Sequence, residues 1–179
     1  MTEDFSLQEL SRLRADFPIL GRVGRGGKPI AYLDFSATSQ KPVQVIDAIS
    51  NFYRTSNGAV HRGTHLLGDE STAAFEEGRA ILADFIGGRA NEIIWTKNAT
   101  EAINLVALAM RNATQDSGVK PSPVKLAAGD NIVITRAEHH ANLVPWQQLC
   151  AATGTELRWL DLHEDGRIDR ETLGVIDEH

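Results

Sequence analysis

The sequence predicts an α/β fold in which helices flank a mostly parallel sheet. Short apolar runs of the kind found in strands alternate with longer segments whose apolar residues recur at helical spacing. Apolar strands separated by helices indicate an α/β layer with a mostly parallel sheet. With 179 residues, 42% of them hydrophobic and 23% charged, the chain is long enough to bury a core.

Three helices and two strands are predicted in the first 96 residues. Apolar residues at helical spacing from Leu7 to Phe17 indicate the first helix, and Pro18 marks its end. Pro42 suits the first turn of the second helix. The third, of about 18 residues, ends at Gly87-Gly88 with Phe75, Leu82 and Phe85 inward, and the runs IAYLDF (30–35) and EIIWT (92–96) are the expected strands.

The second half of the chain repeats a strand–helix alternation more regularly. Strands are predicted for NIVIT (131–135) and ELRWL (156–160), and helices for residues 99–110 and 144–153, the latter ending at Gly154. A further helix is expected from Asp169. Residues 112–128 are polar and contain proline, which predicts a surface loop, an excursion between two units. The expected organisation is an N-terminal helix and loop over 1–30, followed by an incomplete large domain over 31–179.

Composition narrows the class of protein. A net charge of −6 argues against a nucleic-acid partner, and no apolar run approaches the roughly 20 residues needed to span a membrane. The acidic, amphipathic N-terminus is unlike a signal peptide. The single Cys150 cannot form an internal disulfide, which fits a reducing cytoplasm, and its apolar neighbours predict core packing.

Two loops at the carboxyl ends of predicted strands are candidate binding elements. In TKNATEA (96–102), Asn98 and Glu101 have the spacing of a capping box. The free N–H groups there and the Thr100 hydroxyl would suit a phosphate, although a plain helix cap explains the same residues.

The second loop, AEHHAN (137–142), follows the next strand and is expected to lie beside the first. Adjacent residues of an extended segment point in opposite directions, so His139 and His140 are poorly placed to share a metal ion. Two interpretations stay open: a core or capping histidine, or a flat ring that covers a planar ligand.

A third candidate is AVHRGTH (59–65). His61 and His65 have the spacing of a zinc-protease helix, but Arg62 replaces the glutamate of that motif and Gly63 weakens a helix, so no metal site is expected. An arginine beside a histidine suits an anionic substrate or a subunit contact. An ordinary surface loop remains the alternative.

Four motifs in this order resemble one family. YLDFSATSQKP (32–42), AVHRGTH (59–65), NATEAINLVA (98–107) and AEHHANLVPWQ (137–147) are similar to group II (Suf-type) cysteine desulfurases of the class V aminotransferase family. The resemblance implies part of the large domain of a fold-type I enzyme that uses pyridoxal 5'-phosphate. By the same resemblance, Ala99 and Thr100 bind the cofactor phosphate, His139 stacks on the cofactor ring as the catalytic histidine, and Ala37, His61 and Arg62 lie on the substrate side.

The activity that the resemblance implies converts L-cysteine to L-alanine and leaves a persulfide sulfur on the enzyme. A sulfur-acceptor protein then takes the sulfur for iron–sulfur cluster assembly by the SUF system, and the enzyme is a cytoplasmic homodimer. The sequence contains neither the family's Schiff-base lysine in a Ser-x-His-Lys segment nor its persulfide-forming cysteine. We therefore expect an N-terminal portion that is inactive alone; the rivals are another class V enzyme, such as a selenocysteine lyase, and a truncated non-catalytic product.

Overall fold

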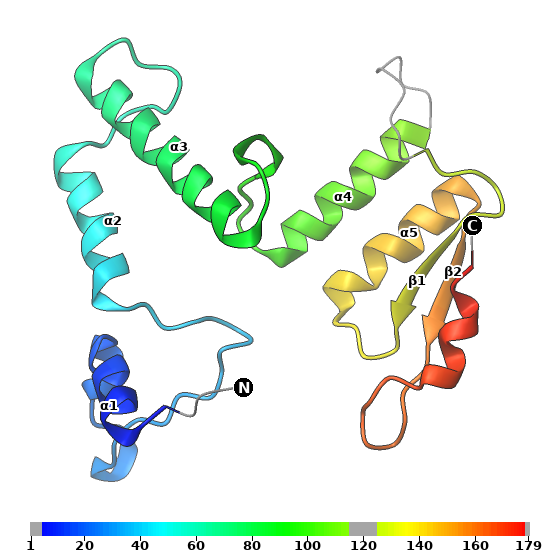
Figure 1. Ribbon diagram of the computed structural model, residues 1–179, viewed down its shortest axis with the longest axis horizontal. Helices are drawn as coiled ribbons and strands as arrows, with labels where there is room; N and C mark the ends of the chain where they lie inside the picture. Colours follow the sequence, from blue (N-terminus) through cyan, green and yellow to red (C-terminus); the bar gives the residue numbers. More distant parts are fainter. Residues whose placement is uncertain (1–4, 115–124, 178–179) are drawn as a thin grey trace. The chain divides into compact units, whose positions relative to one another are not determined.

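The computed structural model describes residues 5–114 and 125–177 (Figure 1). The chain divides into two compact units, one ending at Ile93 and one beginning at Ile94. The first unit is built from helices and turns, and the second contains a two-stranded parallel sheet with helices. None of the helices in the described parts is long and apolar enough to cross a membrane.

The three helices predicted for the first unit are confirmed. They are α1 (Leu7–Ala15), α2 (Val43–Thr55) and α3 (Leu66–Ile86). Ser6 and Glu9 form a reciprocal capping box at the start of α1. Gly87 ends α3 in the left-handed conformation, with φ 73°, and this is why the chain has a glycine there. Short 3-10 turns complete the unit: η1 (Pro18–Gly21), η2 (Arg25–Gly27) and η3 (Ala90–Glu92).

Both strands predicted in the first 96 residues are wrong. Residues 30–35 form no ladder; instead, the Tyr32 hydroxyl donates to the carbonyls of Asp34 and Thr38 and closes a turn. Glu92 is the last residue of η3, and residues 93–96 join no β-ladder among the described residues. An apolar run becomes a strand only when a neighbouring backbone accepts its hydrogen bonds. The inward position of Phe85 is also wrong, because its side chain is 86% exposed.

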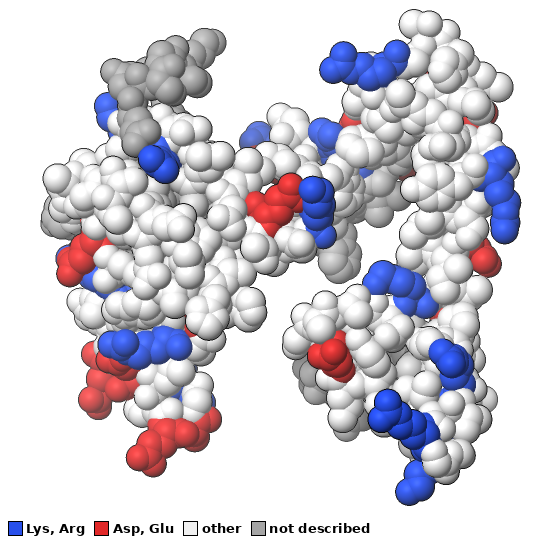
Figure 2. Space-filling view, turned by 180° about the vertical axis from the view of Figure 1, so that it is seen from behind, with Lys and Arg blue, Asp and Glu red and all other residues white. Residues whose placement is uncertain are grey.

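Basic side chains gather over the segment that contains α1 and the two 3-10 turns after it (Figure 2). One of them has a structural role: Arg14 donates to the carbonyl oxygens of Leu20, at 3.0 Å, and Ile30, at 2.7 Å. This guanidinium therefore ties the helix to the glycine-rich loop that follows. The exposed basic residues of the segment are Arg12, Arg14, Arg22, Arg25 and Lys28.

The loop before α3 lies against the first turns of that helix with almost no space between the backbones. A Cβ on Gly58 would lie 2.5 Å from the Leu67 carbonyl oxygen, and one on Gly68 would lie 2.8 Å from Gly63 Cα. The buried Ser71 hydroxyl bridges the contact, donating to the Ser56 carbonyl and accepting from Gly58 N–H. Glycine is required here because the backbones approach so closely.

The second unit contains the predicted strands β1 (Asn131–Thr135) and β2 (Glu156–Leu160), which pair in parallel with Asn131 opposite Glu156. The predicted helices are α4 (Ala99–Thr114) and α5 (Val144–Thr153), and α5 ends at Gly154 as expected. α5 packs on both strands and on α4. Of the excursion predicted over 112–128, residues 115–124 lie outside the described residues.

Two expectations for this unit need correction. The described sheet contains two of the four predicted strands, because 30–35 and 92–96 join no ladder among the described residues. The helix expected from Asp169 is a 3-10 helix, η5 (Arg170–Val175), whose N-cap is Asp169. The core itself is as the apolar pattern indicates, with Ile134, Leu149 and Cys150 buried between sheet and helix.

We expect Gly58→Ala to destabilise the chain by about 1–3 kcal/mol, because the new methyl group forces two backbone segments apart. The matched control is Gly78→Ala within α3, where a Cβ would meet no atom within 4 Å. That change should be neutral or stabilise by up to about 1 kcal/mol, since alanine favours helix. Chemical denaturation of both variants measures the difference, and equal stabilities would contradict the close-contact explanation.

Candidate functional site

The start of α4 is capped by Asn98, as predicted. The Asn98 Oδ1 accepts a hydrogen bond from the Glu101 N–H at 2.9 Å. The Glu101 carboxylate accepts from the Lys97 N–H, at 2.6 Å, so it reaches one residue further back than a standard capping box. This arrangement fixes the turn of chain that leads into the helix.

Three hydrogen-bond donors at this helix start have no acceptor in the part of the chain that the structure describes. Among the described residues, none accepts from the N–H groups of Ala99 and Thr100 or from the Thr100 hydroxyl, and both residues are exposed. The positive end of the dipole of a 16-residue helix lies at the same place. The donor set therefore suits an anion with several oxygen atoms, such as a phosphate group.

His139 lies in the loop that follows β1, and its own backbone holds its ring. The His139 Nδ1 accepts from the Ala141 N–H at 3.1 Å, and its carbonyl accepts from the Asn142 N–H at 2.7 Å. The residue thus caps the short turn η4 (His140–Asn142), as one of the two interpretations of the sequence held. Its ring is nevertheless exposed, so capping leaves one face and the Nε2 available to a ligand.

The rings of the two neighbouring histidines meet edge to face. The ring centroids of His139 and His140 are 6.2 Å apart and the planes are inclined at 75°. Within the described residues there is no group of three His, Cys, Asp or Glu side chains that could hold a metal ion.

Sequence reasoning missed a chain of hydrogen bonds beneath this loop. Thr135 Oγ1 donates to Glu138 Oε1 at 2.8 Å, and Asn142 Nδ2 donates to Glu138 Oε2 at 2.7 Å. Trp146 Nε1 then donates to Asn142 Oδ1 at 2.8 Å. The hydrogen bonds from Asn142 and Thr135 lower the pKa of Glu138. Only the i, i+4 spacing of positions 138, 142 and 146 hinted at this chain.

The His139 loop and the start of α4 lie at the same end of the second unit. η4 contacts α4, and α4 and α5 run in the same direction, so both helices begin beside the carboxyl end of β1 (Figure 1). The neighbourhood expected of the two loops is therefore confirmed. It follows from the parallel α/β arrangement, which brings strand ends and helix starts to one edge.

The 59–65 loop is held differently from a zinc-protease helix. His61 has a positive φ of 59°, which is unusual for a residue other than glycine. Its N–H donates to Thr72 Oγ1 at 3.0 Å, and its Nε2 is hydrogen bonded to Glu76 Oε1 at 2.9 Å. His65 instead caps α3, with Nδ1 accepting from the Gly68 N–H. The two histidines of this loop thus have separate structural roles.

The predicted site residues fall into two groups. Ala37, at an exposed turn closed by its N–H and the Asp34 carbonyl, belongs to the first unit with the exposed His61 and Arg62. The second unit brings together the other group, which consists of Ala99, Thr100 and His139.

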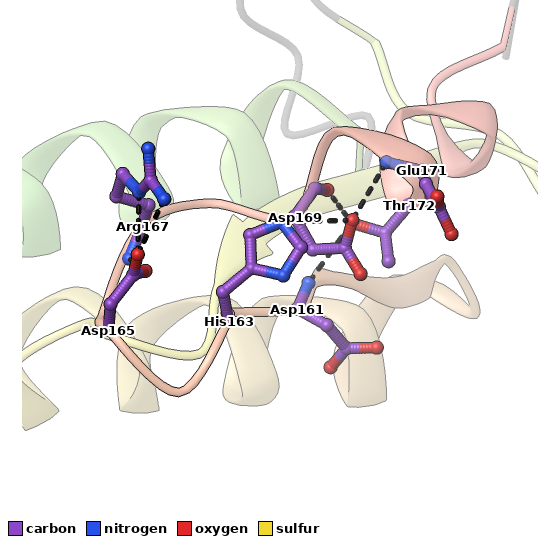
Figure 3. Close-up of polar contacts among 7 residues, drawn as sticks. All are labelled: Asp161, His163, Asp165, Arg167, Asp169, Glu171 and Thr172. Atoms are coloured by element: carbon purple, nitrogen blue, oxygen red, sulfur yellow. Dashed lines mark hydrogen bonds and ion pairs between the residues drawn. The ribbon is translucent and has the colours of Figure 1, made fainter.

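A second polar cluster follows β2 and is held together by its own contacts (Figure 3). The Asp169 carboxylate accepts from the Glu171 N–H at 2.9 Å, and Thr172 Oγ1 donates to the Asp169 carbonyl at 2.6 Å. The Asp161 N–H in turn donates to Thr172 Oγ1. Arg167 forms an ion pair with Asp165 and lowers the pKa of that carboxyl. These contacts close a hairpin onto η5, so we assign the cluster a structural role.

Comparison with known proteins identifies the family. Residues 31–178 match the class-V aminotransferase family. The chain belongs to this family. This class-V aminotransferase homologue is 50% identical over 177 residues to a probable cysteine desulfurase 2 of Mycobacterium leprae (strain TN), and 47% identical over 168 residues to a cysteine desulfurase of Escherichia coli O1:K1. The resemblance to cysteine desulfurases is confirmed.

Solved structures agree with the assignment. A cysteine desulfurase from Thermococcus onnurineus NA1, in its apo form, matches 89% of this chain with a TM-score of 0.73 and 36% identity. The cysteine desulfurase CsdA from Escherichia coli matches 93% with a TM-score of 0.68 and 34% identity. The class-V homologue spans 40% of the Mycobacterium leprae protein and 35% of the Thermococcus onnurineus chain.

Cys150 is 7% exposed on α5, so Cys150→Ala should lower the stability by about 1 kcal/mol. The thiol should react with a disulfide reagent only at the rate at which the chain unfolds, because burial shields it. Denaturation curves and thiol labelling in parallel measure both effects. Rapid labelling under native conditions would contradict the buried position.

The lowered pKa of Glu138 makes the stability depend on pH. A depressed pKa in the folded state contributes stability above the unfolded value of about 4.3, and this is lost as the pH falls through the folded value. Glu138→Gln should therefore flatten the fall in stability below about pH 5. The control is Glu164→Gln, since the exposed Glu164 makes no hydrogen bond or ion pair to the described residues. It should keep the parent's pH profile of the denaturation midpoint.

Proposed function

We propose that this chain forms the N-terminal part of a pyridoxal 5'-phosphate-dependent cysteine desulfurase. The observation that carries the proposal is the end of the second unit where α4 begins beside the His139 loop. There, free donors for an anion lie near an exposed, backbone-held imidazole. The relatives that match this chain are named as cysteine desulfurases, and these names point to the same activity.

The residues at the start of α4 fit the phosphate of this cofactor. The Ala99 and Thr100 N–H groups and the Thr100 hydroxyl offer three donors, and the helix dipole adds attraction for a dianion. The Glu101 carboxylate, which would repel a phosphate, is turned back to the Lys97 N–H. The negative charge of Glu101 therefore lies beside the backbone of Lys97, before the helix begins.

His139 fits the role of a ring that covers the cofactor. An imidazole that stacks on a pyridine ring must keep a fixed plane, and the Ala141 N–H holds Nδ1 for this purpose. The bound cofactor would serve as an electron sink for the amino acid. The Nε2 of His139 stays free to exchange a proton with a bound substrate.

The substrate side would be formed by Ala37, His61 and Arg62. The Arg62 guanidinium suits the carboxylate of an amino acid. The Glu76 carboxylate and the Thr72 hydroxyl hold His61, the residue before Arg62, in its unusual backbone conformation. Backbone strain of this kind is often found at functional sites.

In a protein of the relatives' full length, the proposed reaction converts L-cysteine to L-alanine. The sulfur would pass to a cysteine of the enzyme as a persulfide and then to an acceptor protein for iron–sulfur cluster assembly. The complete enzyme would be a cytoplasmic homodimer of the SUF system. Neither the persulfide-forming cysteine nor the cofactor-linking lysine is present in the 179 residues, so both would come from outside this segment.

Thr100→Val tests the phosphate site in this chain. Removing one charge-assisted hydrogen bond, worth roughly 1.5–3 kcal/mol, should weaken binding of pyridoxine 5'-phosphate about ten- to a hundredfold. This probe lacks the aldehyde and therefore forms no adducts with surface lysines. Titration followed by tryptophan fluorescence measures the affinity.

Two controls separate phosphate binding from helix fraying. Unphosphorylated pyridoxine should bind the parent and Thr100→Val equally. Asn98→Ala should cost about 1 kcal/mol of stability by removing the cap, and should affect affinity only through the frayed helix. If Thr100→Val binds pyridoxine 5'-phosphate as tightly as the parent, the start of α4 is a plain helix cap and the proposed site is wrong.

A further inference from the structure

We propose that Glu138, Asn142 and Trp146 are positioning residues that fix the orientation of the His139 ring. Their side chains form one continuous chain of hydrogen bonds from the end of β1 to the first turn of α5. The inference deepens the proposed function and rests on it in one respect. The ring's orientation matters for ligand binding only if His139 covers the cofactor.

The connection to His139 runs through the backbone of η4. The Asn142 N–H donates to the His139 carbonyl at 2.7 Å, and the adjacent Ala141 N–H donates to the ring Nδ1 at 3.1 Å. Both donors belong to one short turn. Whatever holds Asn142 therefore holds the two groups that set the position and plane of the imidazole.

Asn142 is held from both sides of its amide. Its Nδ2 donates to Glu138, and its Oδ1 accepts from the indole N–H of Trp146. An indole N–H can only donate and a carboxylate can only accept, so the amide has one allowed orientation. All three residues are half-buried, where such hydrogen bonds compete less with water.

Glu138 connects the amide to the sheet. Its second carboxylate oxygen accepts from Thr135, the last residue of β1, whose backbone is fixed by pairing with β2. We call the hydrogen-bonded chain Thr135–Glu138–Asn142–Trp146 the brace. It has a rigid strand at one end and a rigid helix at the other. The eight residues between β1 and α5, held at both ends in this way, lose little entropy when a ligand binds to the exposed His139 ring.

The order of donors and acceptors along these hydrogen bonds allows a rescue experiment. Asn142→Asp places two carboxylates face to face and should disrupt the brace. Adding Glu138→Gln restores a donor and an acceptor, because the new amide donates to the new carboxylate, which still accepts from Trp146. A residue with a general packing role would show no such reciprocity.

The first readout needs no cofactor. In the parent, Nδ1 accepts a hydrogen bond, so the neutral His139 ring carries its proton on Nε2. Ring nitrogen chemical shifts should report this tautomer in the parent and in the double variant, and a mixture in Asn142→Asp. Hydrogen exchange of the Ala141 N–H should accelerate about ten- to a hundredfold in the single variant and return to the parent rate in the double.

Trp146→Phe provides a milder variant that keeps the aromatic packing and removes only the last hydrogen bond. It should move the His139 tautomer in the same direction by a smaller amount. The His163 ring, in the hairpin after β2, serves as an internal control and should not change. If all three variants are folded by circular dichroism and the His139 tautomer equals the parent's in each, the positioning role is wrong.

Ligand titration separates this inference from the proposed function. With pyridoxine 5'-phosphate as probe, Asn142→Asp should weaken binding and the double variant should restore it. His139→Ala is the reference for the ring's own contribution. If His139→Ala binds the probe as tightly as the parent, the proposed cofactor role of His139 fails. The tautomer and exchange data would still decide whether the brace orients the ring.

Discussion

The parallel pairing of β1 with β2 is the constraint on which the rest of the second unit depends. Pairing from Asn131 with Glu156 to Thr135 with Leu160 brings both strand ends to one edge. The helix α5, which packs on both strands, and α4, which packs on α5, begin at that edge (Figure 1). A helix start and a strand-end loop come together there without any direct attraction between Thr100 and His139.

The same edge shows how a folded chain produces an exposed ring with a defined plane. An exposed imidazole in a loop would ordinarily sample several rotamers. Here the order comes from polar groups: the backbone N–H groups of η4 hold the ring, and the Glu138–Asn142–Trp146 chain holds η4. The cost of desolvating the Glu138 carboxylate is offset by its two donors, which also lower its pKa.

In the first unit, a loop is held in a fixed conformation by close contact between backbones. Gly58, Gly63 and Gly68 let the 59–65 loop approach α3 more closely than any side chain would allow. Ser71, 1% exposed, satisfies the polar backbone groups that this approach buries. The loop is thereby rigid enough to hold His61 at a positive φ, and Glu76 and Thr72 supply the two hydrogen bonds that offset this unfavourable conformation.

The sequence by itself determined the α-helices from α1 to α5, because capping and termination are local. Ser6, Gly87 and Gly154 act through atoms within a few residues, and the helices they bound were predicted closely. The sequence also determined the family, since four motifs recur in order. The sequence also predicted that the start of α4 and His139 lie close together, because a parallel α/β alternation implies that placement.

Only the tertiary structure decided which apolar runs become strands and how the loops are held. Residues 131–135 and 156–160 pair with each other in a ladder, whereas 30–35 and 92–96 join no ladder among the described residues. Strand formation needs a partner distant in sequence, and local composition does not contain that information. The same reason hid Glu76 from the sequence, because its hydrogen bond to His61 joins residues 15 positions apart. Glu138 was hidden although its partners are close in sequence, because the direction of a side chain in a loop depends on the strand and helix that hold the loop.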